Sequence, residues 1–154
     1  MKNLKNLDLI GILNQEAIQN KKPFLGICLG MQLIANKSYE NSETAGLSWV
    51  NAEVVKFDFK TSPFSLKIPH VGWNNVVYKN HNDLYSGIEN NHDFYFVHSY
   101  YFQTKENVVS SITNYGIDFV SSIQKDNIYA FQFHPEKSQT AGLKIIKNFI
   151  NVKT

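Results

Sequence analysis

The segment GICLG, residues 26–30, constrains the fold more than any other part of the sequence, and it holds the only cysteine, Cys28. It follows FLGI (24–27), a short apolar run that predicts a strand buried on both faces. The pattern of residues 29–38 then predicts a helix. A strand, a sharp turn and a helix with a nucleophile at the turn form a nucleophile elbow. Glycine lacks Cβ, so the flanking glycines are expected to avoid collisions there.

The chemistry expected at such a turn depends on the start of the following helix. Its free N–H groups and positive dipole end are predicted to lower the pKa of the Cys28 thiol. The backbone N–H of Leu29 is positioned to donate to an oxyanion. The alternative interpretation is that Cys28 is a small buried apolar residue in a glycine-rich packing site.

A reactive thiolate needs a base, and the segment IYAFQFHPEKS offers one in His134. His134 ends an apolar strand, and Pro135 favours an extended conformation for the residue before it. Residues i and i+2 of an extended segment lie on one side, so we expect Glu136 to accept from the His134 ring. Cys28, His134 and Glu136 therefore form a candidate catalytic triad.

The chain has five histidines, and the other four have plainer interpretations. His70 precedes VGWN, and His98 lies in an aromatic strand, so both are predicted to be structural. His81 and His92 fall in asparagine-rich turns and are predicted to be solvated.

The rest of the chain reads as an α/β domain. Residues 3–19 predict an amphipathic helix, and residues 50–59 predict a strand at a sheet edge or in a hairpin. Ser138 is predicted to cap a closing helix. Five further strands are expected at 71–78, 93–102, 107–115, 118–126 and 128–134, and the closing helix at 138–153.

Composition excludes several classes of function. The 154 residues carry a net charge of +2 from scattered lysines, without the basic patch that nucleic acid requires. No run of 18 apolar residues predicts a membrane span, and the first twenty residues do not read as a signal peptide. A single cysteine makes no internal disulfide, which fits a cytoplasmic protein. No Cys/His spacing predicts a metal site, and no cofactor is expected.

Taken together, GICLGMQ and FQFHPEKS resemble the class I (triad) glutamine amidotransferases. IPHVGWN, FYFVHSYYF and FHPEKSQTAGLKIIKNF look like the glutaminase subunit of imidazole glycerol phosphate synthase. The resemblance covers nearly the whole chain. It implies a flavodoxin-like fold, hydrolysis of L-glutamine to glutamate and ammonia, and a (β/α)₈-barrel synthase partner in histidine biosynthesis.

The resemblance also implies residue roles. Cys28 attacks the carboxamide, His134 protonates the departing ammonia, and Glu136 holds the imidazole. The positions that match the glutamine pocket are Gln32, Glu40, Ser99 and Tyr100. The positions that match the surface facing the synthase are Trp73, Asn74, Tyr95 and Lys137.

The chain departs from the family pattern at its N-terminus. The family begins with a βαβ unit and a strand ending in a glycine-bearing oxyanion loop, and residues 1–22 match neither. We therefore expect residues 1–154 to be a single domain that is incomplete at its N-terminus. Two alternatives remain: a non-catalytic relative that only binds the synthase, or a subunit for surface-sugar amidination. A cysteine peptidase would explain the thiol and the histidine but not the other motifs.

Overall fold

The computed structural model describes residues 1–60, 66–79 and 83–152. His81, which we expected to be solvated, lies outside the described residues. The helices are α1 (Lys2–Asn6), α2 (Leu9–Leu13), α3 (Leu29–Leu33) and α4 (Gln139–Ile150), with a π-helix at Asn14–Gln19 and 3₁₀ turns at Asp83–Tyr85 and Pro135–Lys137. Among the described residues, no helix is long and apolar enough to cross a membrane.

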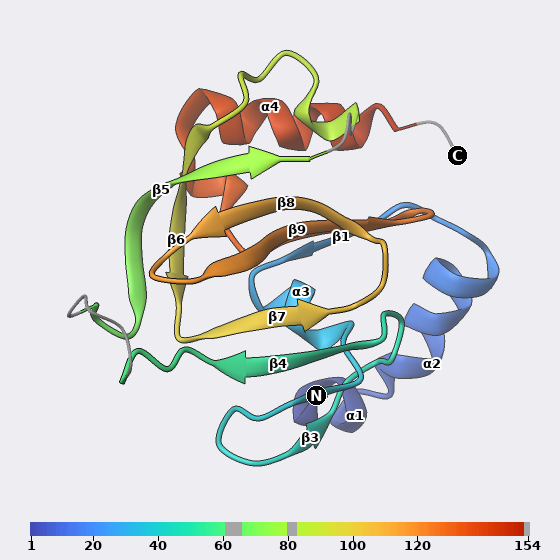
Figure 1. Ribbon diagram of the computed structural model, residues 1–154. Helices are drawn as coiled ribbons and strands as arrows, with labels where there is room; N and C mark the ends of the chain where they lie inside the picture. The colour runs from blue at the N-terminus through green and yellow to red at the C-terminus, as the bar shows by residue number, and fades with distance from the viewer. Residues whose placement is uncertain (61–65, 80–82, 153–154) are drawn as a thin grey trace.

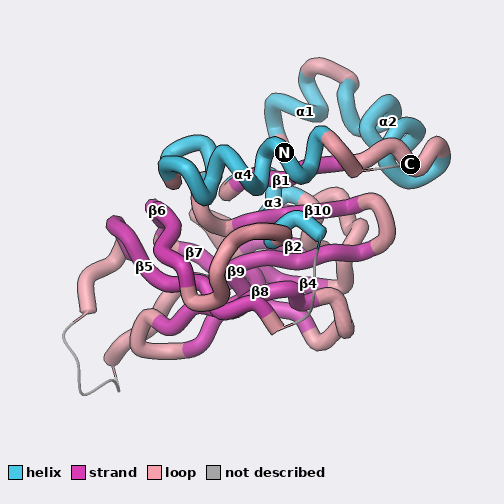
Figure 2. The backbone as a smooth tube through the Cα atoms, turned by 90° about the horizontal axis from the view of Figure 1, so that it is seen from above, coloured by secondary structure: helices cyan, strands magenta, loops and turns pink. Residues whose placement is uncertain are grey.

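Within the described residues, ten strands form a mixed sheet, whose arrangement is drawn in Figure 1. They are β1 (Phe24–Ile27), β2 (Lys37–Ser38), β3 (Thr44–Ala45), β4 (Ala52–Lys56), β5 (His70–Tyr78), β6 (His92–His98), β7 (Tyr100–Thr104), β8 (Val109–Asn114), β9 (Asp118–Lys125) and β10 (Ile128–Phe131). Their order is β3-β2-β4-β7-β9-β8-β5-β6, and β10 joins β9 to β1. Of the strand pairs that the structure describes, only β1–β10 and β2–β4 are parallel, so antiparallel pairing dominates there. The helices α1, α2 and α4 lie on one side of the strands (Figure 2).

The helix predicted over residues 3–19 is broken. Asp8 has φ of 52°, a left-handed conformation that separates α1 from α2. The last turn then widens into the π-helix, whose end is marked by the N–H of Asn20 donating to the carbonyl of Gln15 at 2.8 Å. Neither α1 nor α2 contains a buried residue, so little core packing is available to keep one continuous helix straight.

Four other expectations need correction. The helix predicted over 29–38 ends at Leu33, and Lys37 and Ser38 form β2 instead. The strand within 50–59 is neither at an edge nor in a hairpin, because β4 pairs with β2 and β7 and not with the next described strand, β5. The strand predicted over 93–102 is two strands, β6 and β7, which are separated at Ser99. His92 begins β6 rather than lying in a turn, although it is exposed as predicted.

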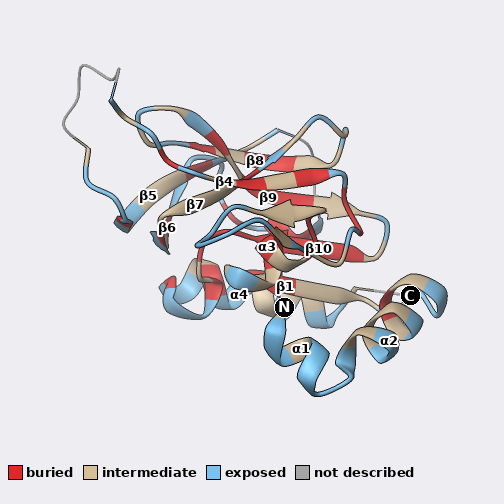
Figure 3. Cartoon of the chain, turned by 90° about the horizontal axis from the view of Figure 1, so that it is seen from below, coloured by how far each residue is buried: buried red, intermediate tan, exposed pale blue. Residues whose placement is uncertain are grey.

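Two hydrophobic cores meet at β10, and all four of its residues are buried (Figure 3). Ile128 and Ala130 belong to a core with Met31, Val54 and Phe102. Tyr129 and Phe131 belong to a second, aromatic core with the buried rings Phe57, Phe94, Phe96, Phe119 and Phe133. Successive strand residues point to opposite faces, so one strand supplies both cores. Burying each such ring stabilises the fold by roughly 1.5–3 kcal/mol, and the two cores together fix the path of the chain as it leaves β10.

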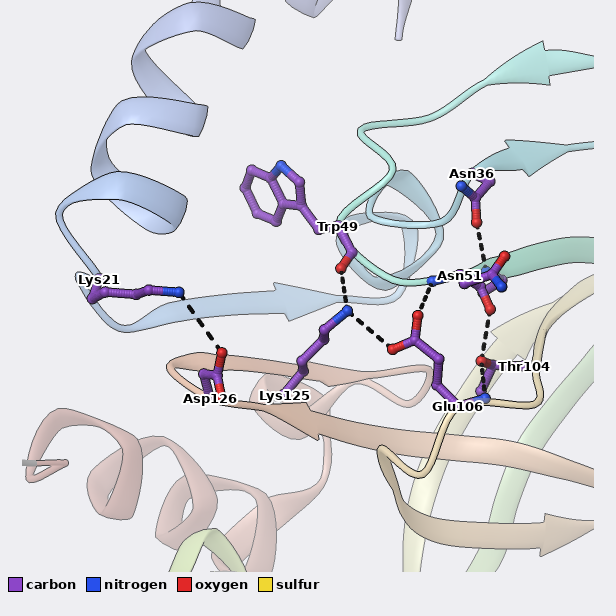
Figure 4. Close-up of polar contacts among 9 residues, drawn as sticks. Lys21, Asn36, Trp49, Asn51, Thr104, Glu106, Lys125 and Asp126 are labelled. Carbon is purple, nitrogen blue, oxygen red and sulfur yellow. Dashed lines mark hydrogen bonds and ion pairs between the residues drawn. The ribbon is translucent and has the colours of Figure 1, made fainter.

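A group of polar contacts around Lys125, called here the lysine cluster, joins β4, β7 and β9 at one end of the sheet (Figure 4). It comprises Trp49, Asn51, Thr104, Glu106 and Lys125. The Lys125 ammonium donates to the Trp49 carbonyl at 2.9 Å and pairs with Glu106 at 3.0 Å. The other Glu106 oxygen accepts from the Asn51 N–H at 2.6 Å, and the Thr104 hydroxyl donates to the Asn51 carbonyl at 2.8 Å. Segments about fifty residues apart are held together by these bonds.

Candidate active site

Cys28 is the residue at which β1 turns into α3. Its φ is 49° and ψ is −102°, a strained conformation for a residue with Cβ, as the elbow predicts. Its N–H donates to the Phe131 carbonyl at 2.7 Å, which ties the turn to the end of β10. A Cβ on Gly26 would lie 2.9 Å from the backbone of Gly30, so glycine is required there. A Cβ on Gly30 would meet nothing within 4 Å, so the second glycine is not required by packing.

The thiol of Cys28 has two polar neighbours besides the following helix. Sγ donates to the Val97 carbonyl at 3.9 Å and accepts from the Gln132 side-chain amide at 3.8 Å. The expected lowering of the thiol pKa is wrong: burial raises it, and the N–H of Leu29 offsets only part of that rise. Desolvation of the largely buried sulfur disfavours the charged thiolate, and this is the larger effect.

The predicted pairing of His134 with Glu136 is present in the structure. His134 Nδ1 lies 2.7 Å from Glu136 Oε1, and His134 itself is extended, with φ of −102° and ψ of 92°. The contact arises from the 3₁₀ turn at Pro135–Lys137 rather than from a continued strand. The other ring nitrogen, Nε2, is buried and has no hydrogen-bond partner among the described residues. That nitrogen is therefore available to a reacting group.

Parallel pairing brings the thiol and the imidazole to one end of the sheet. β1 and β10 run side by side with Ile27 opposite Phe131, so Cys28 and the residues after Phe131 leave the sheet together. Glu136 and Lys137 are both close enough to act on the charge of the Cys28 thiol. The individual catalytic roles of Cys28, His134 and Glu136 remain predictions.

Gln32 and Glu40, two of the residues matched to glutamine binding, line one small cavity of about 120 Å³. Leu29 also lines this cavity, which places it beside the nucleophile turn. Gln32 is nearly buried, and its amide nitrogen donates to the Tyr100 carbonyl at 3.1 Å. Glu40 is exposed, and its N–H donates to the Ser38 hydroxyl at 3.2 Å. The cavity has both polar and apolar lining residues, and Cys28 itself is not among them.

Ser99 and Tyr100 lie where β6 ends and β7 begins. The Ser99 carbonyl accepts from the N–H of Phe57 at 3.1 Å, and both Ser99 and Tyr100 are half-buried. The Tyr100 carbonyl accepts from Gln32 and also from His98 Nδ1 at 2.9 Å. The break between the strands thus places a backbone acceptor beside Gln32.

The four residues matched to a partner surface do not form one group. Trp73 and Tyr95 are opposite each other on β5 and β6, with ring centroids 6.1 Å apart, and Trp73 is 47% exposed. Lys137 is exposed in the 3₁₀ turn, near Cys28. Asn74 points elsewhere, because its amide nitrogen contacts His70 at 3.3 Å and the Asn114 carbonyl at 2.9 Å.

Sequence reasoning missed one residue near the sulfur, Gln132. It is fully buried just beyond β10, among Phe131, Phe133 and the thiol. Its signal in the sequence is a single glutamine inside AFQF, a run otherwise apolar. His70 and His98 are structural as predicted: both are buried, and their rings are 2.9 Å apart from Nδ1 to Nε2. Ser138 precedes α4 but makes no capping bond, because its hydroxyl donates to the His134 carbonyl at 2.6 Å.

A family model described as glutamine amidotransferase class-I matches residues 11–152. The chain belongs to this family. The imidazole glycerol phosphate synthase subunit HisH 1 of Campylobacter jejuni (strain RM1221) is 51% identical to this amidotransferase over 152 residues, covering 99% of it and 74% of that protein. Subunit HisH of Aquifex aeolicus (strain VF5) is 47% identical over 150 residues, covering 97% of this chain and 70% of its own length.

Solved structures show the same fold for this amidotransferase. A putative GMP synthase subunit from Thermoplasma acidophilum aligns with a TM-score of 0.64 at 23% identity, covering 95% of this chain and 64% of that one. A glutamine amidotransferase from Thermotoga maritima aligns with a TM-score of 0.60 at 18% identity, covering 96% of this chain and 53% of that one. The chain therefore spans less than two thirds of either solved relative. The α/β amidotransferase fold expected from the sequence is confirmed.

Proposed function

We propose that this amidotransferase is the glutaminase subunit of an imidazole glycerol phosphate synthase. It hydrolyses L-glutamine to glutamate and ammonia, and the ammonia passes to a (β/α)₈-barrel synthase subunit in histidine biosynthesis. The observation that carries the proposal is the His134–Glu136 pair, at 2.7 Å, on the segment that follows β10, at the end of the sheet where β1 leads into Cys28. Identity near 50% to HisH subunits over almost the whole chain supports the pathway.

The first half of the reaction forms a thioester. His134 takes the proton of the Cys28 thiol, and the sulfur attacks the carboxamide carbon of glutamine. The carbonyl oxygen becomes an oxyanion, which the Leu29 N–H stabilises. The intermediate then collapses, the carbon–nitrogen bond breaks, and His134 returns the proton to the leaving ammonia. The buried Nε2 of His134, which has no partner among the described residues, is the atom that carries this proton.

The second half releases glutamate. A water molecule loses a proton to His134 and attacks the thioester carbon, and the carbon–sulfur bond breaks. The proton returns to the sulfur, which restores the Cys28 thiol. Glu136 accepts from the opposite ring nitrogen and stabilises the imidazolium formed in both halves. A raised thiol pKa means that Cys28 rests in its protonated form, so proton removal by His134 is part of the first step.

The glutamine main-chain groups are assigned to the small cavity. Glu40 and Gln32 line this cavity, and the Glu40 carboxylate supplies a partner for the α-ammonium group. Tyr100 does not line it; its carbonyl accepts from Gln32, and Ser99 is the residue before it. The cavity volume is about 120 Å³, and a small amino acid is the class of substrate proposed for it.

The synthase partner is assigned to an apolar surface on the β5–β6 hairpin. Val71 lies opposite Val97 and Trp73 lies opposite Tyr95, so the four side chains share one face. Val71, Trp73 and Val97 are 54%, 47% and 37% exposed, which is unusual for such large apolar groups close together. The same strand carries the Val97 carbonyl that contacts Cys28, so this surface adjoins the site that releases ammonia.

The test separates ammonia production from ammonia use. In the complex with the synthase subunit, Cys28→Ala should abolish glutamine-dependent turnover and leave turnover with added ammonium salt at the wild-type rate. Equal loss of both activities would contradict the assignment. A wild-type complex that uses ammonia but never glutamine would instead identify a non-catalytic relative. If glutamine-dependent turnover occurs only with a surface-sugar synthase and its acceptor, the subunit functions in sugar amidination.

A further inference from the structure

The buried amide of Gln132 is the starting point, because it lies in an apolar surrounding where an amide is costly. Its side chain is fully buried, between the aromatic rings of Phe131 and Phe133 along the chain. A buried amide without hydrogen bonds costs about 1–3 kcal/mol, so its partners must be accounted for. It has two: Oε1 accepts from Gln32 at 3.3 Å, and Nε2 donates to Cys28 Sγ at 3.8 Å.

The direction of these bonds is fixed by a backbone group. The Tyr100 carbonyl can only accept, so the Gln32 amide must present its nitrogen there, at 3.1 Å. The same nitrogen also faces Gln132, which must then present its oxygen. The remaining nitrogen of Gln132 is consequently turned toward the sulfur. If the Gln132 amide were reversed, its oxygen would face Sγ and its nitrogen would face the Gln32 nitrogen.

The acceptor that sets this direction is itself held from the other side. His98 Nδ1 donates to the same Tyr100 carbonyl at 2.9 Å, and His98 Nε2 accepts from His70 Nδ1 at 2.9 Å. Burial lowers the pKa of His98 to about 3 and that of His70 to about 4, so both rings stay neutral near pH 7. A neutral His98 with its proton on Nδ1 keeps the carbonyl in place at working pH.

The two polar contacts of the sulfur respond differently to ionisation. The Val97 carbonyl accepts from the S–H group at 3.9 Å, and it loses that bond when the proton leaves. The Gln132 N–H donates to the sulfur in both forms and more strongly to the thiolate. Gln132 is therefore the hydrogen-bonded side chain that favours the reactive form, and the charge of Lys137 acts on the thiol in the same direction.

We propose that Gln132 is a positioning residue for the nucleophile, holding the Cys28 thiolate through an amide whose direction is set by Gln32. Its catalytic consequence rests on the glutaminase function proposed above. Gln132 does not line the small cavity, so it acts on the sulfur and not on the bound amino acid. Nothing in the catalytic triad supplies this contact, because Glu136 raises the thiol pKa and the imidazole takes the proton.

The experiment uses the fact that Cys28 is the only cysteine of the chain. Alkylation by iodoacetamide therefore reports one thiol, and its rate against pH gives the thiol pKa without any need for glutaminase activity. The variants are Gln132→Met and Gln132→Leu, which both remove the donor and keep much of the side-chain volume. Gln103→Met, at an exposed strand position, is the matched control.

The expected thiol pKa is lowest in wild type and Gln103→Met, and higher in both Gln132→Met and Gln132→Leu. Loss of the donor should raise the pKa by about one unit, a tenfold smaller thiolate fraction at neutral pH. Melting curves identify the folded variants, and if the Met variant does not fold, the Leu variant decides. A folded Gln132 variant with the wild-type thiol pKa would overturn the proposal.

A second readout separates positioning from a loss of structure. In the complex with the synthase subunit, Gln132→Met should lower kcat for glutamine about tenfold near pH 7, leave KM unchanged, and recover as pH rises through the shifted thiol pKa. A change in KM alone would overturn the proposal. If the wild-type complex does not hydrolyse glutamine, the proposed function fails, yet the alkylation series still decides whether Gln132 holds the thiolate.

Discussion

Two polar networks join distant segments of this amidotransferase, and they are built in opposite ways. The lysine cluster is ionic and partly exposed, with Lys125 and Glu106 side chains 36% and 27% accessible. The site network of Gln32, Gln132 and the Tyr100 carbonyl is neutral and buried. The lysine cluster pairs its charges with each other, whereas the site leaves the Nε2 of His134 without a partner among the described residues.

The difference arises from where water can reach. An exposed ion pair loses little solvation when it forms, and its electrostatic attraction is weak because solvent screens the charges. A buried charge is costly, so a buried network that must point a donor at one atom uses amides and backbone carbonyls. The lysine cluster thus holds the sheet together, and the site network gives direction to a reactive sulfur. The comparison predicts that changes at the site alter activity and that changes at the cluster alter only stability.

The largest expected effect separates the two regions by activity. His134→Ala should reduce glutamine hydrolysis on the order of 10⁴-fold or more, because it removes the proton carrier. Lys125→Met, which removes both contacts of the ammonium group, should leave kcat and KM for glutamine at wild-type values. Steady-state glutaminase assays of the complex check both. A large activity loss in Lys125→Met would show that the two networks are coupled.

The next effect concerns the backbone under the nucleophile. Gly26→Ala should destabilise the fold by about 1–3 kcal/mol, because its Cβ would lie 2.9 Å from backbone atoms of Gly30 and 3.1 Å from the N of Met31. Gly30→Ala is the matched control, with nothing within 4 Å of the new carbon, and helix propensity favours alanine there by roughly 0.5–1 kcal/mol. Urea unfolding measures both, and equal stabilities of the two variants would refute the packing argument.

The smallest expected effect tests the lysine cluster by pH. The Asn51 N–H and then Lys125 hold the pKa of Glu106 below its ordinary value of 4.5. A carboxyl group whose pKa is lower in the folded state stabilises the fold at pH values above its unfolded-state pKa. That stabilisation is lost as the pH falls through the folded-state pKa. Glu106→Gln should therefore cost less than about 1 kcal/mol at pH 7, a difference that shrinks toward pH 3. Urea unfolding at both pH values checks this, with the exposed Glu43→Gln expected to be neutral at each.

The sequence predicted the parts of the site that depend on neighbours along the chain. The strained conformation of Cys28 results from a strand, a turn and a helix in succession, and the His134–Glu136 contact results from a spacing of two residues around a proline. The general α/β class and most strands were also predictable, because alternation of apolar residues is a local signal.

The rest depended on contacts between distant segments. The Gln132 amide is oriented by Gln32, one hundred residues earlier, and by a carbonyl on a third strand. The thiol pKa moved opposite to expectation because burial, a property of the whole fold, outweighed the N–H of Leu29 at the start of the helix. The break between α1 and α2 occurs at Asp8, where no proline or glycine in the sequence predicts it.

The sharing of β10 between both hydrophobic cores has a consequence for engineering this amidotransferase. Its four side chains pack alternately into the two cores. A change of volume at any of them therefore shifts one core and, with it, the chain that carries Gln132 and His134. Laboratory evolution toward a different amide would therefore find its accepted substitutions in the cavity walls at Ser38 and Asn41, which lie outside both cores. The strand would remain invariant while the specificity around it diversified.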